Sequence, residues 1–123
     1  MDEAKTILTV DDSRTMRDML LLTLTEAGYK VIQAEDGVEG LAKLGEQQPD
    51  AIITDINMPR LDGFGFIEQV RRDDRYRGVP ILVLTTESEL DRKERARKAG
   101  ASGWIVKPFN PAKLLDALRR VGA

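Results

Sequence analysis

Five short runs of apolar, β-favouring residues alternate along this chain with segments whose apolar residues recur at three- and four-residue spacing. The predicted strands are Thr6–Val10, 29–34, Ala51–Thr54, Ile81–Thr85 and 104–106. The connections are short and carry no hairpin signal, so the strands cannot simply fold back on one another. This alternation predicts an α/β fold in which a five-stranded parallel sheet is covered by helices on both faces.

Each predicted helix is marked by an apolar stripe that faces a core, apart from one strongly charged helix over 88–99. The stripes are Met16, Met19, Leu20 and Leu24; Val38, Leu41, Ala42 and Leu44; Phe64, Ile67 and Val70; and Leu114, Leu115, Leu118 and Val121. Ala51–Thr54 is almost wholly apolar, which indicates a central strand that is buried on both faces.

Composition restricts the function classes. A chain of 123 residues predicts one domain spanning 1–123 without an attached output domain, and a net charge of -2 argues against nucleic acid as a partner. No apolar run approaches the ~20 residues of a membrane helix and no signal peptide is present, so we expect a cytoplasmic protein without membrane insertion. The chain has no Cys and no His, which excludes disulfides, thiolate zinc sites and Ser-His-Asp triads within it. The remaining oxygen ligands suit a hard cation such as Mg²⁺.

Polar residues of chemical interest end or follow the first, third, fourth and fifth predicted strands. Right-handed crossovers bring the carboxyl ends of parallel strands to one edge of the sheet, so these residues are expected to converge. They are Asp11 and Asp12 after the first strand, Asp55 after the third, Thr85 and Thr86 at the end of the fourth, and Lys107 after the fifth. Three carboxylates at one edge repel one another unless a cation joins them, which predicts a divalent ion.

The chemistry of these residue types suggests how they divide the work. Asp12 and Asp55 directly, Asp11 through water, and the backbone carbonyl of Asn57 would make a half-shell for Mg²⁺. Asp55 is the predicted nucleophile, forming an acyl phosphate, with Lys107 as a point charge for the phosphoryl oxygens. The Thr85 hydroxyl would donate a hydrogen bond to the same group.

Each residue also has an ordinary structural interpretation, as a turn former, a helix cap, a β-former or a strand end. Their convergence on one edge favours the phosphoryl site.

The sequence resembles the receiver domains of two-component response regulators, most closely the single-domain, CheY-like chemotaxis regulators. The resemblance covers essentially the whole chain. It rests on 10–13 (VDDS), 35–37 (EDG), 55–59 (DINMP) with 62–63 (DG), 84–85 (LT), and 100–103 (GASG) leading to 107–109 (KPF). It implies a flavodoxin-like doubly wound (βα)5 fold with strand order 2-1-3-4-5.

The resemblance also implies roles for these residues. Asp55 would be the phosphoacceptor, Asp11, Asp12 and the Asn57 carbonyl would serve Mg²⁺, and Thr85 and Lys107 would contact the phosphoryl group. The Lys107–Pro108 peptide bond would be cis. The donor would be a phosphohistidine on a separate sensor histidine kinase of the CheA type, so the chain itself would be no enzyme beyond its own phosphorylation and dephosphorylation.

In the family, phosphorylation draws the threonine toward the phosphoryl group and an aromatic residue of the fifth strand rotates inward. Here that residue is Trp104, where Tyr or Phe is usual, and Thr86 stands where Ala or Gly is frequent. Asn57 and Glu87 match the chemotaxis regulators and would tune the lifetime of the acyl phosphate. The readout would be binding of a flagellar switch protein, or another target, by a monomer through its fourth helix, fifth strand and fifth helix.

Other interpretations stay open at this stage. Trp104 also fits an ordinary half-buried strand aromatic, and the charged helix over 88–99 also fits a purely solvated face. A receiver of the same chemistry could act as a phosphate sink or relay without motor binding. An aspartyl-phosphate phosphatase of the haloacid-dehalogenase type is disfavoured by Asn57, where that class carries a second Asp. A flavin-binding flavodoxin is disfavoured because acidic strand ends would repel FMN phosphate.

Overall fold

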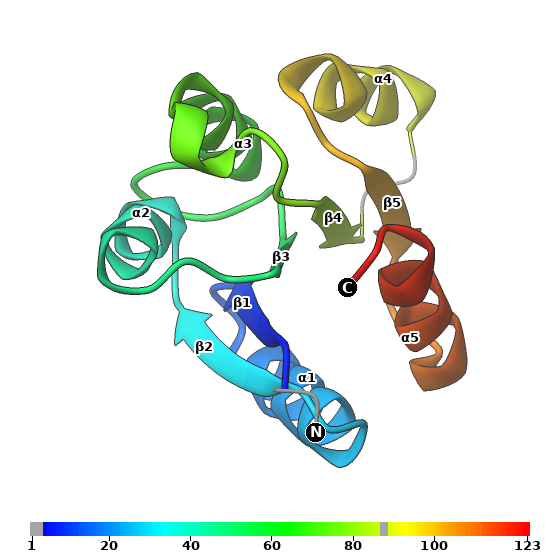
Figure 1. Cartoon of the computed structure of the whole chain (residues 1–123). Helices are drawn as coiled ribbons and strands as arrows, with labels where there is room; N and C mark the ends of the chain where they lie inside the picture. Colours follow the sequence, from blue (N-terminus) through cyan, green and yellow to red (C-terminus); the bar gives the residue numbers. More distant parts are fainter. Residues whose placement is uncertain (1–3, 87–88) are drawn as a thin grey trace.

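The computed structural model describes residues 4–86 and 89–123, and these form one parallel sheet of five strands. The strands are β1 (Thr6–Val10), β2 (Lys30–Ala34), β3 (Ala51–Thr54), β4 (Ile81–Thr85) and β5 (Gly103–Val106). Their order across the sheet is β2-β1-β3-β4-β5 (Figure 1). The α/β class, the five parallel strands and the 2-1-3-4-5 order are therefore confirmed.

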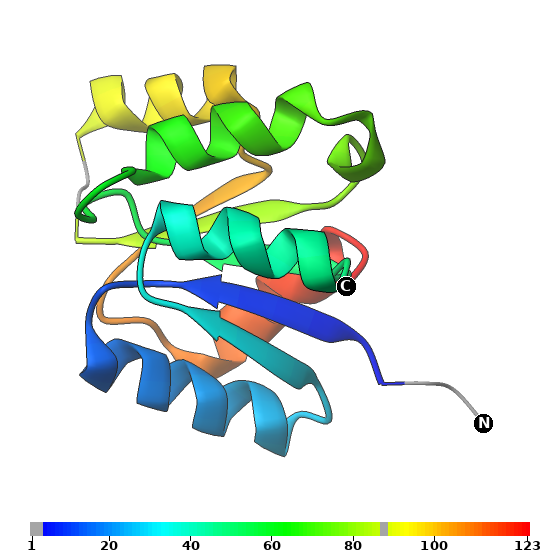
Figure 2. The same cartoon turned by 90° about the vertical axis from the view of Figure 1, so that its left-hand side faces the viewer.

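Five α-helices connect and cover the strands: α1 (Arg14–Glu26), α2 (Gly37–Glu46), α3 (Gly63–Arg72), α4 (Leu90–Ala99) and α5 (Pro111–Arg120). Helices α1 and α5 lie on one face of the sheet, and α2, α3 and α4 lie on the other (Figures 1 and 2). Four of the helices are preceded by a residue whose side chain accepts a hydrogen bond from a backbone N–H of the first turn. These capping residues are Ser13, Asp36, Asp62 and Asn110.

The strands are apolar along their whole length because both faces of the sheet are buried. Leu8, Ile52 and Val83 contribute to the core under α2, α3 and α4, whereas Ile7 and Ile53 contribute to the core under α1 and α5. The alternation of strand side chains thus divides the interior into two layers. The last residues of the strands meet at one edge of the sheet, where the predicted site lies.

The opposite edge of the sheet holds the last residues of the chain. The Lys5 ammonium donates a hydrogen bond to the Gly122 carbonyl (2.7 Å), and the Tyr29 hydroxyl donates one to the Ala123 carbonyl (3.1 Å). Residues that begin β1 and β2 therefore lie beside the end of α5, far from the carboxyl edge.

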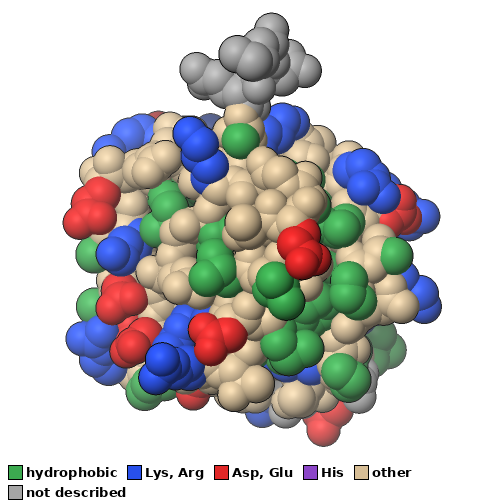
Figure 3. Space-filling model, turned by 90° about the horizontal axis from the view of Figure 1, so that it is seen from below, with side chains coloured by type: hydrophobic (Ala, Val, Ile, Leu, Met, Phe, Trp, Pro, Cys, Tyr) green, Lys and Arg blue, Asp and Glu red, His purple; other side chains and the backbone are tan. Residues whose placement is uncertain are grey.

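Three details differ from the sequence expectation. Met19 and Val38 were expected to face the core, but they are 44% and 43% exposed because neighbouring residues of their helices fill the contact with the sheet. Figure 3 views the side on which α1 lies, where hydrophobic side chains gather on part of the surface.

A 3-10 turn, η1 (Asp74–Tyr76), follows α3 and buries Tyr76, whose hydroxyl donates to the Leu44 carbonyl (2.8 Å).

No helix within the described ranges is long and apolar enough to cross a membrane.

Candidate phosphoryl and metal site

The carboxyl edge of the sheet brings the three predicted carboxylates together. Asp11, Asp12 and Asp55 each present an oxygen, and these oxygens lie within 4.8 Å of one another. Asp11 and Asp55 are buried, whereas Asp12 is exposed to solvent. The cluster is therefore a buried acidic pair with a third carboxylate at its mouth.

Lys107 lies between the two buried carboxylates. Its ammonium donates a hydrogen bond to Asp11 (2.8 Å) and another to Asp55 (2.8 Å). Burial lowers the pKa of Lys107, but the hydrogen bonds to both carboxylates outweigh burial, so the pKa is raised overall. The Lys107–Pro108 peptide bond is cis, as expected from the resemblance.

Asp11 has a different balance of effects. Burial raises its pKa, and the hydrogen bonds from Lys107 and from the Ser13 backbone N–H (2.9 Å) offset only part of that rise. The hydrogen bonds from Lys107 and Ser13 therefore do not fully compensate the cost of burying the negative charge of Asp11. A cation bound beside Asp11 would favour its ionised form.

The backbone around Asp55 fixes the direction of its side chain. The Asp55 N–H donates to the Val10 carbonyl (2.9 Å), and one carboxylate oxygen accepts from the Ile56 N–H (2.6 Å). The Gly63 N–H then donates to the Ile56 carbonyl (2.8 Å), which brings the start of α3 against the end of β3. A Cβ atom at position 63 would lie 2.2 Å from the Asp55 carbonyl oxygen, so only glycine permits this approach.

Arg17 supports the loop that carries Asp11 and Asp12. Its guanidinium donates to the Asp11 carbonyl (2.7 Å) and lies 3.7 Å from a Glu35 carboxylate oxygen. This role of Arg17 was not predicted from the sequence. A signal was present, because position 17 lies three residues before Leu20 on the apolar stripe of the helix, where a charged residue needs a partner.

The predicted switch and rate-tuning residues differ in how far they are buried. Thr85 is fully buried, and its carbonyl accepts from the Lys107 N–H (2.8 Å). Asn57 and Thr86 are exposed. Trp104 is half-buried on β5 and packs against the core under α2, α3 and α4. Their roles stay predictions, and Glu87 lies outside the described residues.

The loop after Asp55 is tied to the start of α2. The Arg60 guanidinium donates two hydrogen bonds to the Asp36 carboxylate (2.7 and 3.0 Å), and the Gly37 N–H donates to the Leu61 carbonyl (3.3 Å). The hydrogen bonds from Arg60 hold the pKa of Asp36 below its ordinary value. This contact between distant residues was not predicted from the sequence.

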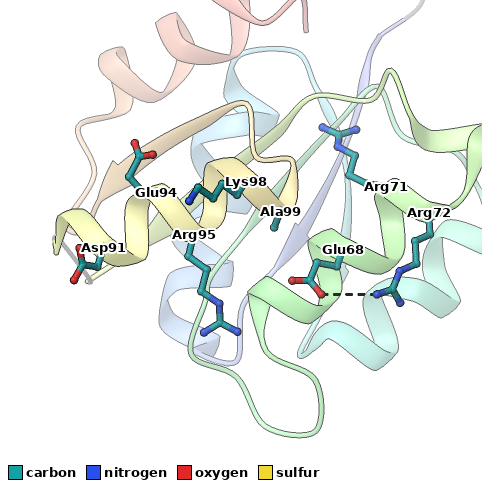
Figure 4. Close-up of a pocket in the computed structure, with 8 residues that line it drawn as sticks. All are labelled: Glu68, Arg71, Arg72, Asp91, Glu94, Arg95, Lys98 and Ala99. Carbon is teal, nitrogen blue, oxygen red and sulfur yellow. Dashed lines mark ion pairs between the residues drawn. The ribbon is translucent and has the colours of Figure 1, made fainter.

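A larger groove of about 650 Å³ lies elsewhere, between α3 and α4 (Figure 4). Its lining mixes cations and anions: Glu68, Arg71, Arg72, Asp91, Glu94, Arg95, Lys98 and Ala99. Arg72 lies 4.0 Å from Glu68, and Arg71 donates to backbone carbonyls of Tyr76, Arg77 and Gly100. None of the acidic-edge residues lines this groove, so we assign the chemistry to the acidic edge.

The acidic edge fits a divalent, oxygen-seeking cation. Its three carboxylates and one ammonium leave two negative charges, which one divalent ion balances. Mg²⁺ is held in proteins by few carboxylates together with water, which the exposed Asp12 and the solvent-open mouth allow. The residues present therefore fit the metal that the sequence predicted.

Comparison with known proteins gives a consistent result. The profile of the response regulator receiver domain matches residues 7–119. The chain is 42% identical over 117 residues to the chemotaxis protein CheY1 of Helicobacter pylori strain J99, which covers 94% of each chain.

Two solved structures are similar along nearly the whole chain. Chemotaxis protein CheY4 of Vibrio cholerae superposes with a TM-score of 0.93 at 47% identity, covering 97% of this chain and 99% of that one. The receiver domain of the sensor histidine kinase PA1611 of Pseudomonas aeruginosa PAO1 superposes with a TM-score of 0.90 at 30% identity, covering 98% of this chain and 100% of that one. The latter structure has a magnesium ion coordinated in its active-site cleft.

Proposed function

This chain belongs to the response regulator receiver domain family, and from that premise we propose that it is a CheY-like switch phosphorylated on Asp55 with the help of Mg²⁺. The observation that carries the proposal is the cluster of three carboxylate oxygens within 4.8 Å, two of whose carboxylates, Asp11 and Asp55, are bridged by the half-buried Lys107. The proposed nucleophile Asp55 accepts a hydrogen bond from Lys107 there and lies beside the two other carboxylates of the proposed cation site.

The proposed reaction transfers a phosphoryl group from a phosphohistidine of a sensor histidine kinase. The P–N bond breaks, its electron pair returns to the imidazole, and a P–O bond forms to an Asp55 carboxylate oxygen. The hydrogen bond from the Ile56 N–H (2.6 Å) orients that carboxylate before the reaction. A Mg²⁺ ion held by Asp11, Asp12, Asp55 and the Asn57 carbonyl would supply charge neutralisation for the phosphoryl oxygens.

Lys107 has two positions in this scheme. In the resting site its ammonium neutralises Asp11 and Asp55, at 2.8 Å from each. When Asp55 becomes an acyl phosphate, that carboxylate loses its charge and the ammonium turns to a phosphoryl oxygen instead. The buried Thr85 hydroxyl would donate to the same group, and the half-buried Trp104 would follow Thr85 inward. A local electrostatic change thereby biases a two-state element.

The output that we propose is binding of a flagellar switch component by the face made of α4, β5 and α5. Two of the relatives described above are chemotaxis proteins, and this face exposes Leu90 of α4 and Val106 of β5, the strand that also carries Trp104. Affinity for a purified flagellar switch protein, measured with and without phosphorylation, tests this part. Equal affinity in both states would instead favour a phosphate sink or relay.

We also propose that the chain does not turn over external substrates. The exposed Asn57 stands two residues after Asp55, where a phosphatase of the aspartyl-phosphate class needs an acid. Repeated turnover of a simple phosphomonoester such as p-nitrophenyl phosphate would contradict this statement.

The main experiment uses the lone tryptophan. Beryllofluoride, a mimic of a phosphoryl group on a carboxylate, is titrated while Trp104 fluorescence is followed in Mg²⁺ or in EDTA. We expect a saturable change that requires Mg²⁺, is lost in Asp55→Asn, and persists in the control Asp18→Asn, which alters an exposed carboxylate of α1. A response that survives in Asp55→Asn would refute Asp55 as the acceptor.

A further inference from the structure

We infer that the ion pair between Arg60 and Asp36 positions the metal-binding loop, so that these two residues set the affinity for Mg²⁺ although neither touches the ion. The inference rests on the proposed function, because it concerns the loop that carries the Asn57 carbonyl. Neither residue belongs to the predicted phosphoryl site, and they lie 24 positions apart in the sequence.

The loop 57–62 is closed by a hydrogen bond between the two residues that flank it, and the rest of the loop extends from the sheet beyond that bond. The Gly63 N–H donates to the Ile56 carbonyl (2.8 Å), which fixes both ends of the segment 57–62. Inside the segment, the Leu61 N–H donates to the Pro59 carbonyl (2.8 Å). These bonds give the loop a shape, but they do not fix its orientation relative to Asp11 and Asp12.

The orientation comes from contacts with the start of α2. Arg60 donates two hydrogen bonds to Asp36, and the Gly37 N–H adds a longer one to the Leu61 carbonyl (3.3 Å). Among the described residues, Arg60 is the only member of 57–61 whose side chain hydrogen-bonds outside the loop. A planar guanidinium that meets a carboxylate at two points fixes direction as well as distance.

The anchor on the other side is rigid. Asp36 is buried, and the oxygen that accepts from Arg60 Nη2 also accepts from the Glu39 N–H (2.9 Å) as the N-cap of α2. Arg60 itself adopts a φ of 67°, a left-handed conformation that is unfavourable for an L-residue other than glycine or asparagine. The side chain therefore stabilises a backbone geometry that its residue type would not choose alone, three positions from the Asn57 carbonyl.

Isothermal titration of Mg²⁺ into the full chain tests this role. In Arg60→Gln we expect the dissociation constant for Mg²⁺ to rise about three- to tenfold, below the roughly 10–100-fold effect of residues that bond directly to metal ligands. Arg60→Lys, which keeps the charge but not the fork, should fall in between. Asp36→Asn, which keeps the α2 cap, should weaken binding similarly, and the double variant should be no weaker than either single one.

A matched control is Arg75→Gln. Arg75 also forms a forked ion pair, with Asp73, and its side chain is 67% exposed against 59% for Arg60, but it lies beyond α3, away from the site. The Arg75→Gln variant should bind Mg²⁺ with the same affinity as the unaltered protein.

Arg60→Gly separates positioning from backbone strain. It relieves the left-handed conformation and removes the ion pair, so it should weaken Mg²⁺ binding if the ion pair matters and strengthen it if strain alone matters. Unchanged affinity in both Arg60→Gln and Arg60→Gly would overturn the inference while leaving the proposed function intact. Absence of saturable Mg²⁺ binding by the unaltered protein would overturn both.

Discussion

Lys107→Met should lower the free energy of unfolding markedly in metal-free buffer at neutral pH. The substitution keeps the length and the apolar stem of the side chain but removes the ammonium that hydrogen-bonds Asp11 and Asp55. The side chains of Lys107, Asp11 and Asp55 are only 10%, 2% and 10% exposed, so water would solvate the two carboxylates poorly after the ammonium is removed. Two carboxylates would be left without their shared counter-ion.

The magnitude follows from these contacts. Removing one partner of a buried ion pair costs about 3–5 kcal/mol, and a single hydrogen bond to a charged group contributes about 1.5–3 kcal/mol. The cluster opens to solvent at Asp12, which lowers the cost. We therefore expect a loss of about 2–4 kcal/mol in the free energy of unfolding.

Urea denaturation in EDTA at pH 7 measures this loss, with Lys113→Met as the control for removing an exposed lysine of α5. The control should change the free energy of unfolding by less than about 0.5 kcal/mol. Saturating Mg²⁺ should narrow the difference for Lys107→Met, because a bound divalent ion replaces the missing positive charge and stabilises only the folded state.

Lowering the pH should also reduce the difference in the free energy of unfolding between Lys107→Met and the unaltered protein. Burial already raises the pKa of Asp11, and loss of Lys107 would raise it further. Between the ordinary aspartate pKa of about 3.9 and that raised value, the folded variant binds more protons than the unfolded chain, so its stability increases as pH falls. A loss below about 0.5 kcal/mol at pH 7 in EDTA, or a larger loss that does not shrink toward pH 4, would refute the argument that Lys107 compensates buried charge.

Three further outcomes are expected from urea denaturation. Gly63→Ala should cost about 2–3 kcal/mol or more because its new Cβ would lie 2.2 Å from a backbone oxygen, whereas Gly45→Ala in α2, with nothing within 4 Å, should gain about 0.5 kcal/mol; similar effects at both sites would contradict this. Because Arg60 lowers the pKa of Asp36, the ionised carboxylate stabilises the fold above pH about 3.9 and this contribution disappears as pH falls through the lowered value, so Arg60→Gln should flatten the acid limb of a stability–pH curve. Asn110→Ala removes the side-chain cap of α5 and should cost about 1 kcal/mol, unless water replaces the bond without loss.

The layout of the sheet could be predicted because each level of the sequence agrees with it. Apolar strands, striped helices and short connections all indicate a parallel sheet, and the observed strand ends differ from the expected ones by a residue or so. The helix expected over 88–99 is observed as Leu90–Ala99 within the described residues. The strand order itself came from the family resemblance, because periodicity does not tell which strands are neighbours.

The site could be predicted only as a gathering of residue types. Topology brings Asp11, Asp55 and Lys107 to one edge, but their 2.8 Å contacts depend on side-chain conformations that no local pattern encodes. The pair of Arg60 and Asp36 was missed for the same reason. Tyr76 was missed because a single 3-10 turn is too short to produce a periodic stripe.

The meeting of Lys5 with Gly122 and of Tyr29 with Ala123 has a practical consequence for engineering. Since the first strand begins where the last helix ends, a short flexible linker could join the two, and the chain could be reopened at the exposed residues 47–48 between α2 and β3. Such a circular permutant would change the order of elements along the chain without touching the carboxyl edge. Its Mg²⁺ affinity should match that of the parent protein, and new ends for labels or fusion partners would then be available on the side away from the acidic cluster.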